Sequence, residues 1–404
     1  ESGSKWALEN TARLVGLELE YERGTVAGEL EIRRLAWTGD TVSIEFGGTI
    51  LQLSPGCLWR SSVCFQQLSA QSLTIAMASD SVEQAASEEA RDVLIEFPVP
   101  VVARSLLLGT LSVTWGGGEW RQGSIEAAVE ISGSRIRVSH AVIRDANLVL
   151  QDTGDSVQPF EPSDISLPLD LQVDELVLEQ GSWDLYGNGG ELQSLRLKGS
   201  WLRNTLQLEA LHLHGAELGS WNAAAGIEFS GKWPVNARGT SELPQIDGWP
   251  ELLERNIAFA VTGGLDALAV EAEISGRIAV SANTVINVLD SKLPFQLQTT
   301  LNWPDKLLLS ELLEMPEAIA TTTLTAPLTL AANGDLQEQV FQLHLSAGVP
   351  AYPELGLQLA GSHRPGNLQI DDLRVQGQAG ANTLWASGAV DYGDTIKISA
   401  LLES

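Results

Sequence analysis

Period-two alternation of apolar and polar residues constrains this chain more than any other feature. Leu355, Leu357 and Leu359 alternate with small or polar residues, and similar runs recur along most of the chain. Alternation over about five to eight residues is typical of a strand with one buried and one wet face. Turn residues such as 333–335 and 365–367 separate these runs roughly every 8 to 12 positions, which predicts antiparallel meanders with strand in more than half of the residues.

Helical patterns are sparse. Residues 4–15 predict a short helix, since Leu8, Ala12 and Val15 would share one face and Gly16 would end it. The acidic segment 81–92 is either a short exposed helix or a loop, and the Pro-rich segment 152–168 is a linker or long loop. We therefore treat residues 1–404 as one continuous, elongated, mainly β segment.

A weak internal repeat joins a strand to a glycine turn. Residues 192–199, 208–215 and 369–377 share this pattern, with a one-residue slip in the alternation. The slips from Leu208 to Leu211 and from Ile370 to Leu373 predict a β-bulge at each place. A repeated unit of this kind favours an architecture that grows along one axis.

The apolar faces of so many strands need a cover, and too few helical segments exist to supply one. Two arrangements remain. In a sandwich or solenoid, the apolar faces pack on each other and form a dry core. In a long sheet curled into a trough, the inner face meets an apolar ligand. Alternation alone does not choose between them.

Composition excludes several classes of function. Acidic residues outnumber basic ones by 52 to 24, for a net charge of −28. This opposes an extended nucleic-acid footprint, which needs a basic face, and disfavours docking on an anionic membrane surface. No stretch of 18 apolar residues occurs within these 404 residues, so the sequence predicts no membrane-spanning helix in them.

Catalytic motifs are missing as well. The sequence contains no P-loop, nucleophile elbow or dinucleotide fingerprint, so we predict no active site and no cofactor. His212 and His214 lie two apart and could ligate a metal. Their alternation with Leu211 and Leu213 favours solvated histidines on the polar face instead.

The two cysteines bracket a short loop. Cys57 and Cys64 are separated by six residues, which is not a usual zinc spacing. In a reducing compartment they would be two unrelated buried thiols, whereas in an oxidising one a pair this close would bridge.

Several segments of the chain, including the cysteine loop, resemble a known family. The loop 57–64, followed by Leu68, Leu73 and Ile75, is similar to the periplasmic part of the TamB family, as is the segment 229–243. The unit 373–391 is typical of the wider AsmA-like superfamily of bridge-like lipid transport proteins. The resemblance covers essentially the whole chain and implies the N-terminal part of a longer protein. An inner-membrane anchor helix would precede residue 1, and a later C-terminal region would meet a TamA-like outer-membrane barrel.

The resemblance implies a periplasmic bridge in a Gram-negative bacterium, anchored to the inner membrane. It would conduct phospholipids between the inner and outer membranes along a hydrophobic β-groove, with no catalysis. The alternative is a scaffold or chaperone for outer-membrane protein and autotransporter assembly that templates client strands. A third possibility is a structural solenoid with a dry core.

A periplasmic location also favours a disulfide between Cys57 and Cys64. The acyl chains of phospholipids would contact one apolar face of the groove. The side chains expected to line it are Leu167, Leu169, Leu171, Val173, Leu206, Leu208, Leu293, Phe295, Leu297, Leu301, Leu324, Leu328, Leu330, Leu355, Leu357, Leu359, Ile396 and Ile398.

Overall fold

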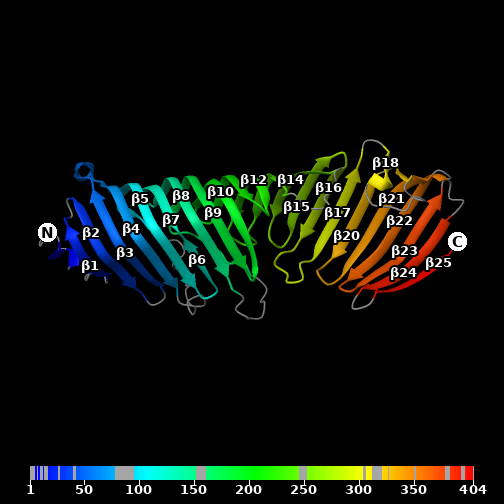
Figure 1. The fold of residues 1–404 in the computed structure, drawn as a ribbon, viewed down its shortest axis with the longest axis horizontal. Coiled ribbons are helices and arrows are strands. Elements are labelled where there is room, and N and C mark those ends of the chain that lie inside the picture. Colours follow the sequence, from blue (N-terminus) through cyan, green and yellow to red (C-terminus); the bar gives the residue numbers. More distant parts are fainter. Residues whose placement is uncertain are drawn as a thin grey trace. The chain divides into compact units, whose positions relative to one another are not determined.

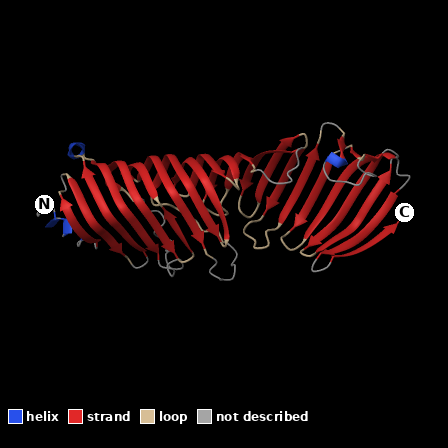
Figure 2. Ribbon diagram, in the orientation of Figure 1, coloured by secondary structure: helices blue, strands red, loops and turns tan. Residues whose placement is uncertain are grey.

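The computed structural model is almost entirely β. It describes residues 5–6, 8–9, 12, 17–25, 28–39, 42–77, 95–151, 161–244, 253–303, 306–311, 321–325, 327–349, 352–377, 383–392 and 396–403. Strand makes up 77% of these residues, and none of their helices reaches seven residues (Figure 2). The all-β prediction is therefore confirmed. Two short 3-10 helices within the described residues, η1 (Pro55–Arg60) and η4 (Leu309–Glu311), interrupt the strands.

The chain divides into two compact units. Unit 1 comprises residues 1–156 and 163–230, and unit 2 comprises residues 157–162 and 231–404. Of the expected N-terminal helix 4–15, the described residues 5, 6, 8, 9 and 12 are helical. The acidic segment 81–92 lies outside the described residues. The expectation of one continuous groove over residues 1–404 stays a prediction.

The described part of unit 1 forms the first twelve strands. Each strand pairs with the strands that lie next to it in the sheet (Figure 1). The twelve strands are β1 (Leu17–Gly24), β2 (Glu29–Thr38), β3 (Val42–Leu53), β4 (Val63–Met77), β5 (Phe97–Trp115), β6 (Gly118–Gln122), β7 (Ser124–Gly133), β8 (Arg135–Leu150), β9 (Asp170–Leu185), β10 (Asn188–Leu202), β11 (Thr205–Gly215) and β12 (Gly219–Glu228). Strands β6 and β7 both lie between β5 and β8, one after the other.

Two pairings in unit 1 are parallel, which corrects the expectation of an antiparallel meander. β4 pairs with β5, and β8 with β9, in the same direction. A parallel connection must return the chain to the starting edge and needs about a dozen residues or more. The acidic segment 81–92 falls between β4 and β5, and the Pro-rich segment 152–168 falls between β8 and β9. Alternation reports only which face a side chain occupies, so it could not reveal strand direction.

The described residues of unit 2 form thirteen strands, and their described pairings are all antiparallel. They are β13 (Val235–Glu242), β14 (Leu253–Gly263), β15 (Leu268–Gly276), β16 (Ala279–Ile286), β17 (Phe295–Asn302), β18 (Leu307–Leu308), β19 (Thr323–Leu324), β20 (Leu328–Gly334), β21 (Gln339–Val349), β22 (Tyr352–Arg364), β23 (Asn367–Gly377), β24 (Thr383–Tyr392) and β25 (Ile396–Glu403). Strand β17 pairs with β20, while the short β18 and β19 pair with each other and β19 continues beside β21.

Both predicted bulges are confirmed. The register of β11 against β12 shifts between Leu208 and Leu211, and that of β23 against β24 shifts between Ile370 and Leu373. One additional residue at each place restores the apolar residues to one face after the slip in the sequence.

Few apolar side chains are fully buried. Among the described residues, one sealed cluster is formed in unit 2 by Ile278, Leu307 and Leu324, which are 1–2% exposed. The accessible surface is 25042 Å². A compact monomer of this mass would expose about 15,000 Å², and two separate compact domains of half that mass about 18,000 Å². The protein therefore exposes more surface than closed globular domains of the same mass would.

Candidate functional site

The apolar face of unit 1 is organised in rows that cross the strands. One row contains Ile136, Leu171, Trp201, Leu206 and Ile227, on strands β8 to β12, each paired with the next. Directly opposed residues on neighbouring strands share a face, so these side chains form a continuous apolar band. All five are half-buried, which places them between a sealed core and an open surface.

The apolar face is hollowed across β2, β3, β4 and β5. The hollow measures about 280 Å³. Leu35 of β2 is directly paired with Phe46 of β3, and Leu51 of β3 is directly paired with Leu68 of β4. The full lining, which we call the β2–β5 hollow, is Ile32, Leu35, Phe46, Thr49, Leu51, Leu68, Ser69, Ala70, Leu73 and Leu106–Leu108. A cavity with this lining fits a hydrocarbon chain.

A kink in β3 lies beside the β2–β5 hollow. Gly48 has a φ of 56°, and the register skips it against both β2 and β4. This left-handed conformation is open to glycine at little cost, which explains the residue type here. The next residue, Thr49, is 7% exposed, and its Oγ1 has no hydrogen-bond partner in the described structure. This hydroxyl is an exception to the usual pairing of buried polar groups.

Unit 2 has an apolar face of the same construction. Leu330, Leu343, Leu359 and Leu373 are paired in sequence across β20 to β23, and Thr299 on β17 extends the row. These side chains are half-buried, whereas their sequence neighbours Gln342, His344 and Gln358 are exposed on the opposite face. Strand alternation thus separates a leucine band from a polar band.

Most of the residues expected to line a groove lie on these two apolar faces and are half-buried. On unit 1 they are Leu171, Val173, Leu206 and Leu208. On unit 2 they are Phe295, Leu297, Leu301, Leu328, Leu330, Leu355, Leu357 and Leu359.

Other expected lining positions differ. Leu324 is 2% exposed inside the sealed cluster, so it is closed to a ligand. Leu293 precedes β17 in a left-handed turn with φ 50°, not on the strand. Leu167 and Leu169 precede β9, and the Leu167 N–H instead donates to the carbonyl of Arg203. The alternation in the sequence runs past the true strand ends in both cases. The side chains of Ile396 and Ile398 lie outside the described part of the structure.

The β2–β5 hollow was not anticipated from the sequence. Its strands alternate poorly, because register shifts interrupt the β3–β4 and β5–β7 pairings and because β5 carries Leu106, Leu107 and Leu108 in succession. The available signal was this run of leucines rather than a period.

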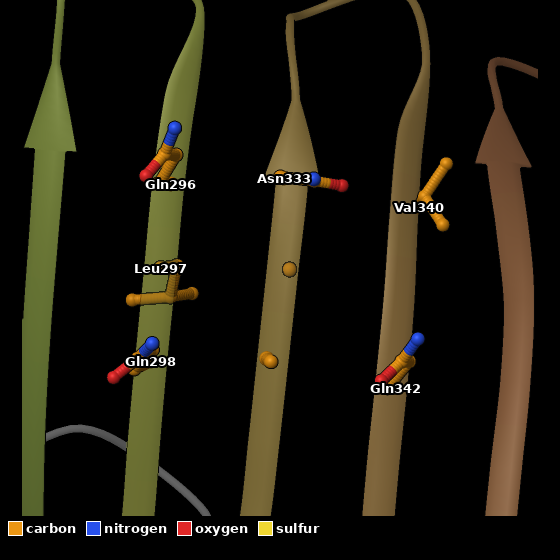
Figure 3. Close-up of a pocket in the computed structure, with 8 residues that line it drawn as sticks. Gln296, Leu297, Gln298, Asn333, Val340 and Gln342 are labelled. Carbon is orange, nitrogen blue, oxygen red and sulfur yellow. The ribbon is translucent and has the colours of Figure 1, made fainter.

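The opposite face is polar in both units. In unit 2 a shallow hollow of about 280 Å³ lies on this face, bordered by Gln296, Gln298, Asn333 and Gln342 (Figure 3). Leu297, between the two glutamines, extends to the other side of β17. In unit 1, His212 and His214 are exposed here and hydrogen-bond to Asn222 and Ser220. Within the described residues, no group of three or more His, Cys, Asp or Glu side chains could hold a metal.

Ion pairs cross the strands of this polar face. Arg34 on β2 contacts Glu18 on β1 at 3.0 Å and Glu45 on β3 at 2.9 Å. The hydrogen bond from Arg34 lowers the pKa of Glu45, and the two carboxylates raise the pKa of Arg34. Arg144 on β8 is similarly placed between Glu126 and Glu179, each at 3.1 Å. Such exposed pairs add little stability, but they match a solvated face.

A disulfide joins Cys57 to Cys64 across the connection between β3 and β4, with Cα atoms 5.8 Å apart. Cys57 lies in η1, and Cys64 is the second residue of β4. The bond therefore closes a loop at the edge of the sheet, beside strands that line the β2–β5 hollow.

Sequence comparison identifies the family. The N-terminal domain model of TamB matches residues 1–404. The chain belongs to the TamB family. The translocation and assembly module subunit TamB of Haemophilus influenzae is 20% identical over 340 residues, which is 75% of this chain and 26% of that protein. The chain thus spans about a quarter of this curated relative. No solved structure matches it.

Among the described residues, no helix is long and apolar enough to cross a membrane.

Proposed function

We propose that this chain is part of a bridge that conducts phospholipids between the inner and outer membranes, with acyl chains lying on the apolar faces of units 1 and 2. The supporting observation is that leucine-rich rows cross neighbouring strands while their side chains remain half-buried. A dry core would have sealed them, as it seals Leu324 at 2% exposure.

The chemistry of the rows suits movement rather than tight recognition. Burial of each CH₂ group contributes about 0.8 kcal/mol, and this attraction has no preferred direction. An acyl chain can therefore pass from one leucine to the next across paired strands without losing much contact. The charged headgroup would remain in water, since the described apolar rows offer it no counter-ion.

The proposed setting follows the family. The longer protein would be anchored to the inner membrane, reside in the periplasm and meet a TamA-like outer-membrane barrel through a later region. The disulfide suits the oxidising periplasm. The proposed activity needs no cofactor and no catalytic residue.

A second candidate, a scaffold for outer-membrane protein and autotransporter assembly, is favoured by the name of the Haemophilus influenzae relative, a translocation and assembly module subunit. Such a scaffold would template a client strand along the edge of a sheet. The two candidates use different surfaces, namely the apolar face and the sheet edge.

Photo-crosslinking at neighbouring positions tests the conduit. Leu73 and Leu297 lie on apolar faces, while Thr74 and Gln298 are exposed on the polar faces of the same strands. We expect phospholipid adducts from a photoreactive amino acid at positions 73 and 297, and few from 74 and 298. Equal labelling of both faces, or no lipid labelling in a folded protein, would contradict the proposal. Peptide adducts in place of lipid adducts would favour the scaffold.

A charge substitution supplies a second readout. Leu297→Asp places an unpaired carboxylate in the path of the acyl chains, which is costly to desolvate. Co-purified phospholipid should fall in this variant, while Gln298→Asp should retain it. Far-UV circular dichroism should show that both variants keep their strand content.

A further inference from the structure

One corner of unit 1 exposes an unusual amount of apolar surface. Trp59, at 93% exposure, lies in η1, and Ile95 and Val99 are 48% and 38% exposed near the start of β5. We call these three residues the Trp59 corner. Three exposed apolar side chains at one place form an apolar patch, and such patches mark contact sites.

The sheet places these residues together. Strands β4 and β5 run parallel and begin at the same edge, with Val63 paired to Val101. Trp59 lies four residues before Val63, and Val99 lies two residues before Val101. The three residues therefore belong to segments that meet at one edge of the sheet, where η1 is the short helix drawn in blue at the upper left of Figure 2.

The loop that carries Trp59 is held closed. The disulfide joins Cys57 to Cys64 on either side of it, and the Ser62 N–H donates to the Cys57 carbonyl at 3.3 Å. The Ser54 N–H donates to the Cys64 carbonyl at 2.8 Å. Because the loop is closed, the indole can insert into another phase with little loss of backbone entropy.

We propose that the Trp59 corner inserts into the interfacial layer of a phospholipid bilayer and sets the β2–β5 hollow at the membrane surface. The size of the corner supports this occupant. Three side chains bury at most on the order of 500 Å², below the roughly 800 Å² per partner of a stable protein interface. An indole, with an apolar ring and one N–H, suits the boundary between headgroups and acyl chains.

Continuity with the hollow supports the same occupant. Strands β4 and β5 begin next to the corner and carry one side of the β2–β5 hollow. A lipid leaving the bilayer at this edge would meet Leu68 and Leu106 next. This docking role rests on the proposed function of the apolar face. The net charge of −28 predicts that the bilayer is better bound when it is zwitterionic than when it is anionic.

The test is co-sedimentation of residues 1–404 with large vesicles of pure phosphatidylcholine. We expect the wild-type chain to bind, and Trp59→Ser to lower its partition coefficient at least about tenfold, since full burial of a large apolar side chain is worth about 1.5–3 kcal/mol. Tyr186→Ser is the matched control. Tyr186 is 65% exposed on the β9–β10 turn, at the opposite edge of unit 1. The Tyr186→Ser chain should bind the vesicles like the wild type.

The outcomes separate docking from conduction. Trp59→Ser should still co-purify with phospholipid, because the hollow is intact. The docking proposal would be overturned if Trp59→Ser bound vesicles as strongly as the wild type. It would also be overturned if Trp59→Ser and Tyr186→Ser lost vesicle binding equally. A wild-type chain that carries phospholipid yet does not bind vesicles would overturn it as well. Vesicle binding through Trp59 by a chain that carries no phospholipid would instead overturn the conduit and leave the docking site standing. Capture of a folded protein partner by Trp59, without vesicle binding, would identify a protein socket and overturn the bilayer assignment.

Discussion

Units 1 and 2 present the same leucine-rich face but assemble it differently. Unit 1 contains two parallel pairs, β4–β5 and β8–β9, whereas the described pairings of unit 2 are all antiparallel. Parallel neighbours start at one edge, so unit 1 gathers η1, the disulfide and the exposed start of β5 at a single place. Hairpins send successive strand starts to alternate edges. Strand direction, more than composition, therefore determines where specialised features can collect.

The two units also differ in how their apolar side chains are buried. Unit 2 has the Ile278–Leu307–Leu324 cluster, against which Leu301 and Trp303 pack. Unit 1 has a disulfide at its edge and an open hollow in its apolar face. Local stability in unit 2 should therefore depend on a few buried leucines, and that of the β3–β4 region of unit 1 on a covalent link.

The largest expected effect is on the sealed cluster. Leu324→Ala should destabilise unit 2 by about 2–5 kcal/mol, because it leaves a cavity among fully buried side chains. Leu330→Ala, in the half-buried row, should cost about 1 kcal/mol. Urea unfolding followed by hydrogen exchange in β20 and β21 measures both. Equal large losses would mean that the leucine rows form a dry core, which would contradict the conduit.

The disulfide should have the next largest effect, and it should be confined to unit 1. Replacing both Cys57 and Cys64 with Ser should lower the stability of the β3–β4 region by about 2–3 kcal/mol, as loop-closure entropy predicts for so short a loop. Hydrogen exchange in β13 to β25 should stay unchanged. Two free thiols in the intact non-reduced protein, found by mass spectrometry, would remove the basis for this difference between the units.

The smallest effect concerns a hairpin turn of unit 2. Asp335 Oδ1 accepts hydrogen bonds from the N–H groups of Gln337 at 2.7 Å and Glu338 at 3.0 Å, which lower its pKa. A lowered folded pKa means that this stabilisation is present above the unfolded value near 3.9 and is lost as pH falls through the folded value. Asp335→Ala should speed amide exchange at Gln337 and Glu338 at pH 7. The difference from wild type should vanish in strong acid; a difference that persists there would exclude the carboxylate as its cause.

The strand content and the two faces could be predicted because both are local properties. Leu355, Leu357 and Leu359 alternate in the sequence and lie half-buried on one face of β22. The bulges at Leu208–Leu211 and Ile370–Leu373 were equally visible, since each breaks the period by one residue. The family could be inferred from the cysteine loop and the segment after Phe229, and the family model confirmed it.

Pairing partners could not be predicted, because they depend on distant segments. Nothing near Val63 indicates that its neighbour is Val101 rather than the next strand of a hairpin. The sealing of Leu324 depends on Ile278 and Leu307, which are distant in sequence. The β2–β5 hollow arises where four strands meet, and bulges erase its periodic signal. Trp59 looked like part of a cysteine motif, and only its exposure singled it out.

The serial pairing of strands has a mechanical consequence within each unit. A tensile load applied along the direction in which strands stack falls on one ladder after another, so the shortest ladder yields first. The β8–β9 ladder runs from Arg135–Asp170 to Leu150–Leu185. In unit 2, β20–β21 runs only from Thr329–His344 to Gly334–Gln339, and β17–β20 only from Phe295–Gly334 to Leu301–Leu328. Under such a load, these short ladders of unit 2 should separate before the β8–β9 ladder does.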